Sequence, residues 1–391
     1  MPDPIKQTIT RHRAYYCLEC GKCTATCPVA RQDSGFSPRR IVEEVVAGRA
    51  HAVLESPLAW ACLTCRRCSE ICPSDVHYSE FTRELRILAR EIGHQGACTH
   101  GDTIHTWMRM MADPALKQNR LDWLMGDLQV SPTSDTVYWV GCLPYYDVLF
   151  RRQGFQGVDI ARAAVRVLNA LDIVPAVLAD ERCCGHDLLW QGDVNTFRHL
   201  AELNLELLRS TGARRIVTSC PECAYTLKVD YPAFVGNTGM EVLHIAELLS
   251  ASDLLSAIRH LLSATRHPPS ATHHSPSATY QDPCRLGRYM HVYDAPRQLL
   301  RALGIEIVEM AHAGKTSTCC GTSGWTNCGA TSKAIQVERL REARATGAEM
   351  LVTACAKCQI HFLCAMDDPR LGAEIEMPVR DLITLVANAL E

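Results

Sequence analysis

The chain has 391 residues, of which 47% are hydrophobic, so it is long enough for two or three domains with ordinary apolar cores. Its formal net charge of −3 gives no indication of nucleic-acid binding, since chains that bind nucleic acids usually carry a basic excess. No basic segment followed by an apolar one opens the sequence, and no run of about eighteen apolar residues occurs, so we expect neither a secretory signal nor a membrane span of its own. The distinctive feature is the content of 21 cysteines, which outside secreted proteins indicates metal binding more often than disulfides.

Residues 1–100 carry one cysteine pattern twice. The pattern is C-x2-C-x2-C-x3-C followed by proline, and its cysteines are Cys17, Cys20, Cys23 and Cys27, then Cys62, Cys65, Cys68 and Cys72. Apolar residues at helical spacing predict helices over residues 38–50 and 79–92. Since no alternating strand pattern occurs here, we expect a small, mostly helical domain.

Bacterial ferredoxins carry the same run, in which three thiolates of a tight loop bind one 4Fe–4S cubane and the fourth cysteine binds the other cubane. We therefore predict two cubane 4Fe–4S clusters, one held by Cys17, Cys20, Cys23 and Cys72 and the other by Cys62, Cys65, Cys68 and Cys27. Zinc is the alternative, because it often binds C-x-x-C pairs, but zinc does not require this four-cysteine run with its proline. Two neighbouring cubanes would pass single electrons between a partner and a deeper site.

A connector over residues 101–134 follows, and its tryptophan and methionine side chains favour core packing over a partner-facing surface. An apolar strand is then expected over residues 136–142, helices over 161–171 and 195–210, and a second strand over 215–218.

The last third of the chain repeats this order. Residues 212–220 (GARRIVTSC) match residues 347–355 (GAEMLVTAC), and corresponding cysteines stand 319 − 183 = 136 and 355 − 220 = 135 residues apart. We therefore predict an internally duplicated α/β domain with a first half over 135–264 and a second half over 279–391. The stretch 265–278, rich in Pro, Ser, Thr and His, is expected to link the halves.

Each half carries five cysteines in one arrangement: a lone cysteine, a Cys-Cys-Gly triplet and a C-x-x-C pair. The first set is Cys142, Cys183, Cys184, Cys220 and Cys223, and the second is Cys284, Cys319, Cys320, Cys355 and Cys358. Four cysteines suffice for a simple cubane or a zinc site, so a fifth indicates a different centre. Gly185 and Gly321 would let the backbone approach an inorganic core closely. A thioredoxin-type dithiol is the alternative for each C-x-x-C pair, but two full five-cysteine sets speak against it.

Acid–base helpers are less clearly marked. His186 directly follows the first triplet and could donate a proton to a leaving thiolate, although a hydrogen bond that tunes a cluster is the plainer interpretation. Lys228 and Lys357 could attract an anionic thiol, but solvated surface positions are expected for both. Cys98 and Cys364 fall outside every pattern and are expected to be small buried residues.

The lone-Cys, Cys-Cys-Gly and C-x-x-C arrangement resembles the cysteine-rich CCG domain of the heterodisulfide reductases. A ferredoxin-type module ahead of two such copies is similar to the D subunit, in which a C-type and a B-type part are fused, and the resemblance covers residues from about 14 to 385. It implies an N-terminal α-helical ferredoxin-type domain followed by a duplicated α/β domain with pseudo-twofold symmetry, an α+β and α/β architecture. One departure is that the second triplet continues as Thr322-Ser323-Gly324, less glycine-rich than many relatives, with Cys328 close by.

In that family each five-cysteine set holds a noncubane 4Fe–4S cluster, and a disulfide of small thiols is reduced in one-electron steps between the two clusters. The resemblance therefore implies a cytoplasmic oxidoreductase subunit acting on a sulfur group, which receives electrons from a flavoprotein, a membrane cytochrome or a hydrogenase-type partner. Relatives with the same architecture, such as the iron–sulfur subunits of glycolate oxidase or the electron-delivery module of benzoyl-CoA reductase, suggest the alternative of an electron relay without a substrate of its own.

Overall fold

The computed structural model describes residues 3–265, 275–370 and 374–390, so most of the predicted linker over 265–278 lies outside the described residues. The chain divides into two compact units. The first unit comprises Met1–Asp113, Gly185–His199 and Lys315–Arg339, and the second comprises Pro114–Cys184, Leu200–Gly314 and Leu340–Glu391. The first triplet lies at a boundary, with Cys183 and Cys184 in the second unit and Gly185 in the first, whereas the second triplet belongs to the first unit.

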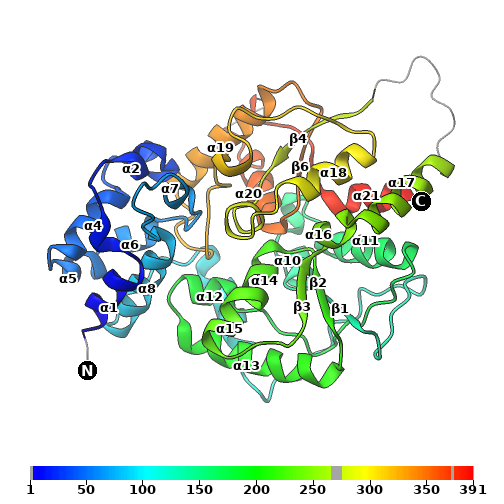
Figure 1. Ribbon diagram of the computed structural model, residues 1–391, viewed down its shortest axis with the longest axis horizontal. Coiled ribbons are helices and arrows are strands. Elements are labelled where there is room, and N and C mark those ends of the chain that lie inside the picture. The colour runs from blue at the N-terminus through cyan, green and yellow to red at the C-terminus, as the bar shows by residue number, and fades with distance from the viewer. Residues whose placement is uncertain (1–2, 266–274, 371–373, 391) are drawn as a thin grey trace. The chain divides into compact units, whose positions relative to one another are not determined.

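Short helices make up the N-terminal part of the first unit (Figure 1). They are α1 (Pro4–Arg11), α2 (Lys22–Thr26), α3 (Pro28–Gln32), α4 (Pro38–Val46), α5 (Ala50–Leu54), α6 (Leu58–Ala61), α7 (Arg67–Glu70), α8 (Tyr78–Glu91) and α9 (Thr103–Met110). The helix expected over 38–50 ends early, since Gly48 adopts φ 84° and separates α4 from α5. Ser37 caps α4 by accepting a hydrogen bond from the amide of Arg40, as its Ser-Pro start predicts.

The two ferredoxin-type runs repeat in backbone conformation as well as in sequence. Glu19 and Thr64, which hold the same place in the two runs, have φ 52° and 44°, and the residues two further on, Gly21 and Arg66, have φ 75° and 66°. A left-handed conformation is costly for a β-branched residue such as Thr64, so the loop must be held by its surroundings. This tight loop begins α2 in the first run and α7 in the second.

Two parallel sheets form the framework of the second unit. One has the order β1 (Thr136–Trp139), β2 (Arg215–Thr218) and β3 (Glu241–His244), and the other has the order β5 (Glu306–Ile307), β4 (Ser277–Gln281), β6 (Met350–Thr353) and β7 (Val379–Asp381). The longer helices of this unit include α11 (Gly157–Ala170), α17 (Ser252–Thr265), α20 (Ala356–Met366) and α21 (Leu382–Leu390), while the division falls within α13 (Val194–Thr211) and α19 (Ala330–Arg344). The strands over 136–139 and 215–218 and the helices α11 and α13 confirm the predicted elements to within a few residues.

The duplication is visible in the sheets. The order β1-β2-β3 corresponds to β4-β6-β7, and the β4–β5 pairing has its counterpart in a parallel bridge between Val137 and Ala176. The last strand of each half ends at the residue that caps the following helix, His244 before α16 (Ile245–Ser250) and Asp381 before α21. Mixed helices and parallel strands in two matching halves are thus as the sequence predicts.

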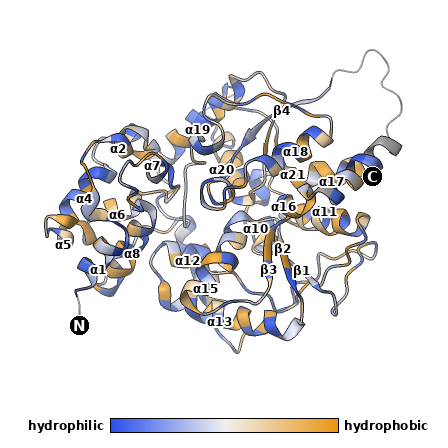
Figure 2. Ribbon diagram, in the orientation of Figure 1, coloured by the Kyte–Doolittle hydropathy of each residue, from blue (hydrophilic) through white to orange (hydrophobic). Residues whose placement is uncertain are grey.

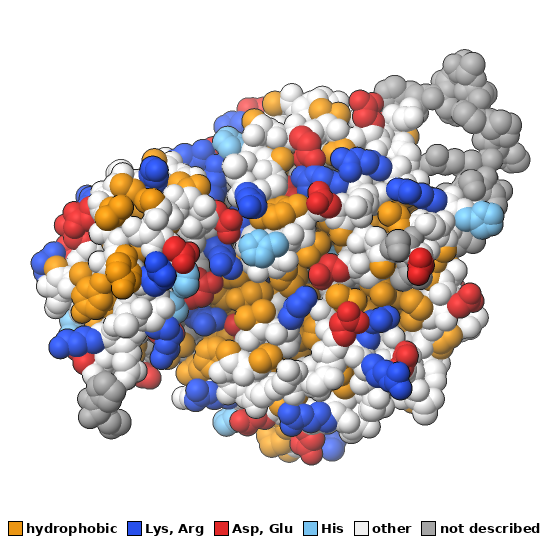
Figure 3. Space-filling view, viewed as in Figure 1, with side chains coloured by type: hydrophobic (Ala, Val, Ile, Leu, Met, Phe, Trp, Pro, Cys, Tyr) orange, Lys and Arg blue, Asp and Glu red, His pale blue; other side chains and the backbone are white. Residues whose placement is uncertain are grey.

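Burial on both faces explains why the strands are so apolar. All four residues of β1 are buried, and Figure 2 shows hydrophobic residues in β2 and β3. On the face in view, Figure 3 shows acidic and basic side chains interspersed, in keeping with the small net charge. Among the described residues, no helix has the length and apolar character needed to cross a membrane.

In the connector, Met108, Met111 and Trp123 are buried as expected, whereas Met110 and Met125 are exposed by 61% and 48%. The predicted domain boundaries themselves remain predictions.

Candidate metal centres

Both ferredoxin-type runs lie in the first unit, where each set of thiols draws its fourth member from the other run. One cavity is lined by Cys17, Cys20, Cys23 and Cys72, with Cys68 also in its wall. Cys27 instead interacts electrostatically with Cys62 and Cys65, and Cys68 interacts with the same three thiols. The short helices α2 and α7, which follow the central cysteines of each run, pack against each other. The thiols of the two runs thus lie close together, and their assignment to two cubanes remains a prediction.

Electrostatics in these loops oppose the ionised state of the bare thiols. Burial, with the neighbouring thiolates of Cys65 and Cys62 adding to it, raises the pKa of Cys27 to about 12, although the amides of Ala30 and Val29 favour the thiolate. Burial and the charges of Cys62 and Cys65 likewise raise the pKa of Cys68. Such thiols become ligands only where a cationic core compensates their charge, so the donor set fits an iron–sulfur cluster.

The first five-cysteine set lies wholly in the second unit. The Sγ atoms of Cys142 and Cys183 are 3.6 Å apart, Cys184 is hydrogen-bonded to Cys183 and Cys223, and Cys223 is hydrogen-bonded to Cys220 as well. Cys183, Cys184 and Cys223 are buried, whereas Cys142 and Cys220 are half-buried. The hydrogen bonds and charges of the neighbouring thiols, together with burial, raise the pKa of Cys142. Five sulfur donors are thus gathered at one place.

Strand ends and helix starts position these thiols. Cys142 follows β1 and precedes α10 (Leu143–Leu149), and Cys220 follows β2 and precedes α14 (Pro221–Tyr225). Both strands are predicted from the sequence, whereas α10 is not. The C-terminal edge of a parallel sheet is where ligands commonly bind. Gly141 has φ 67°, and a Cβ atom there would lie 3.0 Å from the Sγ of Cys223, so a side chain at this position would crowd the set.

A buried cation stands beside the first set, which sequence reasoning missed. The Arg120 guanidinium donates to the backbone carbonyls of Glu181 and Gly141, and its charge favours the thiolate of Cys142. The Glu181 carboxylate accepts hydrogen bonds from the amides of Val140 and Gly141, at 3.0 and 2.6 Å. Burial raises the pKa of Glu181 to about 7, against the opposing effect of Arg120 and the two amides. Neither residue belongs to a local sequence motif, because the contact joins segments 61 residues apart.

The amide of Asn204 holds the first triplet from the other side. Its Nδ2 donates to the carbonyl of Cys183 at 2.9 Å, and its Oδ1 accepts from the amide of Arg182 at 3.0 Å. Because Asn204 lies on α13 and is fully buried, this clamp fixes the backbone that carries the paired cysteines.

The second set is divided between the units. Cys319 and Cys320 are buried in the first unit, where their loop is joined to the second ferredoxin-type run. The hydroxyls of Thr64 and Ser323 are 2.8 Å apart, and the Arg67 guanidinium donates to the hydroxyl of Thr318 at 3.1 Å. The left-handed Thr64 is held by this contact between two cysteine loops.

The other three cysteines of the second set lie in the second unit. Cys284 directly precedes a π-helical turn (Arg285–Tyr289), and Cys355 precedes α20, which carries the buried Cys358. Arg285 is buried against the rings of Tyr289 and Tyr225, 4.1 and 5.9 Å from their centres.

Some predicted placements were wrong. Lys357 is not a solvated surface residue but is 4% exposed in its side chain, with Nζ 2.6 Å from Oε2 of Glu222, whereas Lys228 is largely exposed as expected. Cys98 and Cys364 are half-buried rather than buried. Lys357 can be buried because Glu222, in the C-x-x-C segment of the other half, supplies a carboxylate for its ammonium group.

The predicted helpers make local contacts. His186, at the start of α12 (His186–Trp190), is buried with Nδ1 3.1 Å from Asp187 Oδ1 and its ring stacked on Trp190.

Gly185 has φ 83°, and a Cβ there would meet the ring of Phe197 at 2.6 Å. Gly321 has φ 96°, and its Cβ would meet the carbonyl of Ser332 at 2.8 Å. Both glycines are therefore required by helix packing, and their part in cluster binding remains a prediction.

Comparison with known proteins defines the class. The model of the cysteine-rich domain matches twice, over residues 136–228 and 278–363, and that of the 4Fe-4S dicluster domain matches residues 13–76. The chain is thus an iron–sulfur protein with one dicluster domain and two cysteine-rich CCG domains.

Its resemblance to the D subunit of heterodisulfide reductase is confirmed. The chain is 32% identical to the D subunit of the dihydromethanophenazine:CoB–CoM heterodisulfide reductase of Methanosarcina mazei over 282 residues, 70% of this chain and 63% of that protein. The chain therefore belongs with the heterodisulfide reductase D-like proteins, while it spans less than two thirds of the length of these relatives.

Other relatives bear different names. A probable membrane-anchored ferredoxin of Chromohalobacter salexigens is 28% identical over 96% of this chain and 59% of its own length. The B subunit of a fumarate reductase (CoM/CoB) of Methanothermobacter marburgensis is 25% identical over 94% of this chain and 71% of its own length. These proteins are iron–sulfur oxidoreductase components, which supports an oxidoreductase role for this chain.

Proposed function

We propose that the chain is an iron–sulfur oxidoreductase subunit that passes electrons from two cubane clusters to two noncubane clusters, where a disulfide of small thiols is reduced or formed. The observation that carries this proposal is the gathering of five thiols, Cys142, Cys183, Cys184, Cys220 and Cys223, beside the buried cation of Arg120. Zinc sites use four ligands, so the fifth thiol favours an iron–sulfur centre. Clusters bound in these sites would supply electrons one at a time.

In this proposal the N-terminal thiols are divided as their contacts suggest. Cys17, Cys20, Cys23 and Cys72 hold one cubane, supported by the cavity that they line together. Cys62, Cys65, Cys68 and Cys27 hold the other, supported by their mutual charge interactions.

The second noncubane site would use Cys284, Cys319, Cys320, Cys355 and Cys358 by analogy with the first set. The matching strand orders β1-β2-β3 and β4-β6-β7 support two halves related by a pseudo-twofold axis. The ion pair of Lys357 with Glu222 supports it too, because each residue lies within the C-x-x-C segment of its half.

Electrons have a short route within the first unit. Thr64 lies between two proposed ligands of the second cubane, and its hydroxyl contacts Ser323, three residues after Cys320. Arg67 contacts Thr318, the residue before Cys319. These contacts favour delivery from the second cubane to the Cys319–Cys320 loop.

A flavoprotein, a hydrogenase-type subunit or a membrane cytochrome would supply the electrons, and through such a partner a cytoplasmic chain would become membrane-associated. The exposed loop of the first run is suited to this docking. Cys20 is exposed, and the neighbouring Tyr15, Tyr16 and Leu18 are exposed by 56%, 63% and 69%.

Electron paramagnetic resonance of the anaerobically purified protein tests the proposal. The protein is oxidised with and without candidate small thiols, and we expect a signal that appears only with thiol and shifts with its identity. Cys183→Ser should abolish this signal and disulfide reduction, while the signals of the reduced N-terminal cubanes persist. Disulfide reduction that is unchanged in Cys183→Ser would contradict the proposal.

An electron relay without its own substrate is the second candidate. A protein named EtfAB:quinone oxidoreductase of Syntrophomonas wolfei, 28% identical over 65% of this chain and 34% of that protein, supports an electron-transfer role without indicating a thiol substrate. Cubane signals indifferent to thiol, together with a co-purifying catalytic subunit, would favour the relay.

A further inference from the structure

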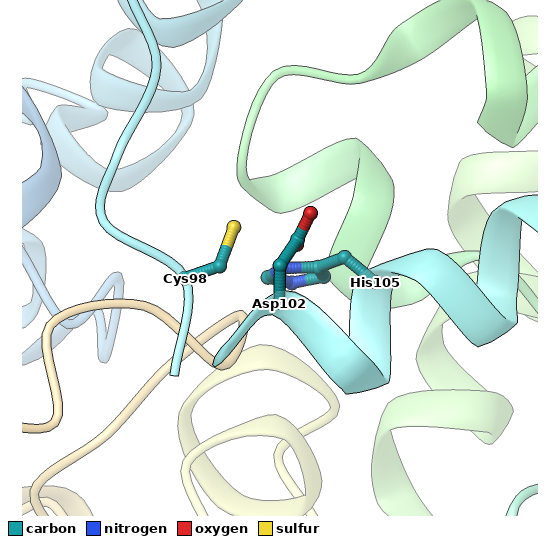
Figure 4. A group of neighbouring side chains, drawn as sticks. All are labelled: Cys98, Asp102 and His105. Atoms are coloured by element: carbon teal, nitrogen blue, oxygen red, sulfur yellow. The ribbon is translucent and has the colours of Figure 1, made fainter. Parts of the chain in front are cut away.

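Three potential metal ligands that belong to neither cysteine pattern meet in the first unit. Cys98, Asp102 and His105 each offer one ligand atom, and these atoms all lie within 4.8 Å of one another. Figure 4 shows Asp102 and His105 projecting from the start of α9 and the Cys98 thiol facing them from the preceding segment. A thiolate, a carboxylate and an imidazole are the three ligand types that zinc combines in proteins.

The histidine is oriented as a metal ligand would be. His105 is 1% exposed, and its Nε2 lies 2.8 Å from the carbonyl oxygen of Gly324, to which it donates. The proton is therefore on Nε2, and Nδ1 carries a lone pair. Metal-bound histidines characteristically donate their other ring N–H to a carboxylate or a backbone carbonyl.

Two buried atoms at this place lack hydrogen-bond partners within the described part of the chain. Nδ1 of His105 and Oδ1 of Asp102 are buried, lie 3.5 Å apart and form no hydrogen bond of ordinary geometry with any described residue, although the thiol of Cys98 interacts with the Asp102 carboxylate. Buried polar atoms that lack a hydrogen bond destabilise the folded chain, so a bound group between them is favoured. A cation would satisfy both, since each presents a lone pair.

The surrounding charges leave one carboxylate oxygen for the metal. Arg109 binds the other oxygen, Oδ2, of Asp102 at 3.1 Å and also binds Asp193 at 3.3 Å. Asp193 also binds Arg90, at 3.4 Å, so this carboxylate is shared by two cations, and the charges of Arg109 and Arg90 favour the thiolate of Cys98. Arg109 orients the Asp102 carboxylate and leaves its Oδ1 available to a cation.

Backbone hydrogen bonds hold the segment that carries Cys98 without any bound metal. The amide of Thr99 donates to the carbonyl of Trp325, and the amide of Asn327 donates to that of Ala97, each at about 3 Å. A Cβ on Gly96 would lie 2.3 Å from the indole of Trp60, so the segment passes close to this ring. Cys98 thus needs little reorganisation to bind a metal.

The amide of Gln191 lies beside the thiol. Its Oε1 is 4.0 Å from Sγ of Cys98, and its buried Nε2 lacks a partner among the residues that the structure describes. If the Gln191 amide is turned by about 180°, which exchanges its nitrogen and oxygen, it directs an N–H toward a metal-bound thiolate. A hollow of about 700 Å³ lined by Cys98, Thr99 and His100 would admit water to the fourth position.

We propose that Cys98, Asp102 and His105 form a zinc site separate from the iron–sulfur centres. The site has three protein ligands and a water, and through His105 and Gly324 it supports the segment that follows Cys320. The alternative, a hydrogen-bonded cluster around the carboxylate, leaves Nδ1 of His105 unsatisfied in the interior.

Metal analysis of the full chain tests this proposal. The protein is purified anaerobically, loaded with Zn²⁺ and desalted, and zinc and iron are measured in the same sample by mass spectrometry. We expect about one zinc per chain. The zinc should be lost in Cys98→Ser and in His105→Gln with iron unchanged, while Cys364→Ser, which alters an unrelated cysteine, should retain both metals.

X-ray absorption at the zinc edge identifies the atoms bound to zinc in the unaltered protein, so it tests the proposal even if a variant also loses iron. In the unaltered protein the expected first shell has one sulfur at about 2.3 Å and nitrogen or oxygen neighbours at about 2.0 Å. Zinc at background, zinc retained in His105→Gln, or an all-sulfur shell would each overturn the proposal, the last by placing zinc among the cluster cysteines.

Discussion

The ammonium group of Lys357 lies 2.6 Å from the carboxylate of Glu222, and both side chains are largely buried. Lys357 stands between Cys355 and Cys358, and Glu222 stands between Cys220 and Cys223. The ion pair therefore joins the C-x-x-C segments of the two halves of the duplicated domain. Tyr225 and Tyr289 pack edge to face in the same region, with ring centres 4.9 Å apart.

Breaking this pair from one side should be costly. Lys357→Met removes the ammonium group from the buried Glu222 carboxylate, which keeps only the charge of Arg285 nearby, and we expect a loss of up to about 3–5 kcal/mol in the free energy of unfolding. Urea titration under argon, followed by far-ultraviolet circular dichroism, measures the loss. The double variant Lys357→Met/Glu222→Leu should recover most of it, because the buried carboxylate is gone. A single variant within about 0.5 kcal/mol of the unaltered protein would contradict the expected role.

Motifs and elements that repeat along the sequence could be predicted from it, whereas contacts between residues far apart in the sequence could not. Cysteine spacing and apolar periodicity indicated that the thiols of the two ferredoxin-type runs act together, which remains a prediction, and they indicated the strands β1 and β2 that precede Cys142 and Cys220. A lysine between two cysteines, by contrast, shows no sign in the sequence that its partner lies 135 residues earlier. Lys357 was therefore expected at the surface.

The same limit applies to the charges around the first set. Arg120 stands in a connector whose composition suggested only packing, and Glu181 lies two residues before Cys183 without belonging to the cysteine pattern. Cys98, Asp102 and His105 do share a short stretch of chain. Their spacing is irregular, however, and only the turn at residues 100–102, with φ between 56° and 64°, brings them together.

Gly141 offers a test of crowding at the first set. Gly141→Ala introduces a left-handed alanine, which costs about 1–2 kcal/mol, and a methyl group 3.0 Å from Sγ of Cys223. We expect the amount of iron per chain to fall and the thiol-dependent signal in electron paramagnetic resonance to weaken, because the methyl group displaces the Cys223 thiol.

Gly154→Ala is the matched control. Gly154 has φ 80°, and a Cβ there would have no neighbour within 4 Å, so the backbone cost is similar but no thiol is displaced. Iron content should be retained in this variant. Equal loss of iron in the two variants would show that backbone strain, not contact with Cys223, decides the outcome.

The Arg120 cation should tune the reduction potential of the first centre. Arg120→Gln removes a buried positive charge that favours the Cys142 thiolate, so adding an electron nearby becomes less favourable. We expect the reduction potential of the centre that gives the thiol-dependent signal to become more negative by tens of millivolts. A redox titration followed by electron paramagnetic resonance measures this shift. Arg120→Lys keeps the charge and should keep most of the potential. A potential that is the same in all three proteins would exclude an electrostatic role for Arg120.

The buried Asp381 should make the stability of the second unit depend on pH. Burial raises its pKa to about 7, although the amides of Ile383 and Thr384, which it caps at the start of α21, favour the ionised form. Between pH 4 and 7 the folded chain therefore holds a proton that the unfolded chain has released. The free energy of unfolding consequently falls as pH rises through this interval and levels off above pH 7, with a contribution of at most about 4 kcal/mol.

Asp381→Asn keeps a side-chain oxygen for the cap but removes the titrating group. The difference between the unfolding free energies of the variant and the unaltered protein should grow in favour of the variant from pH 4 to pH 7 and stay constant above. Urea titrations at a series of pH values measure this difference. Asp367→Asn, which alters an exposed carboxylate at the end of α20, should show no such trend. A difference for Asp381→Asn that is independent of pH would mean that the carboxylate is ionised throughout, so that its capping bonds outweigh its burial.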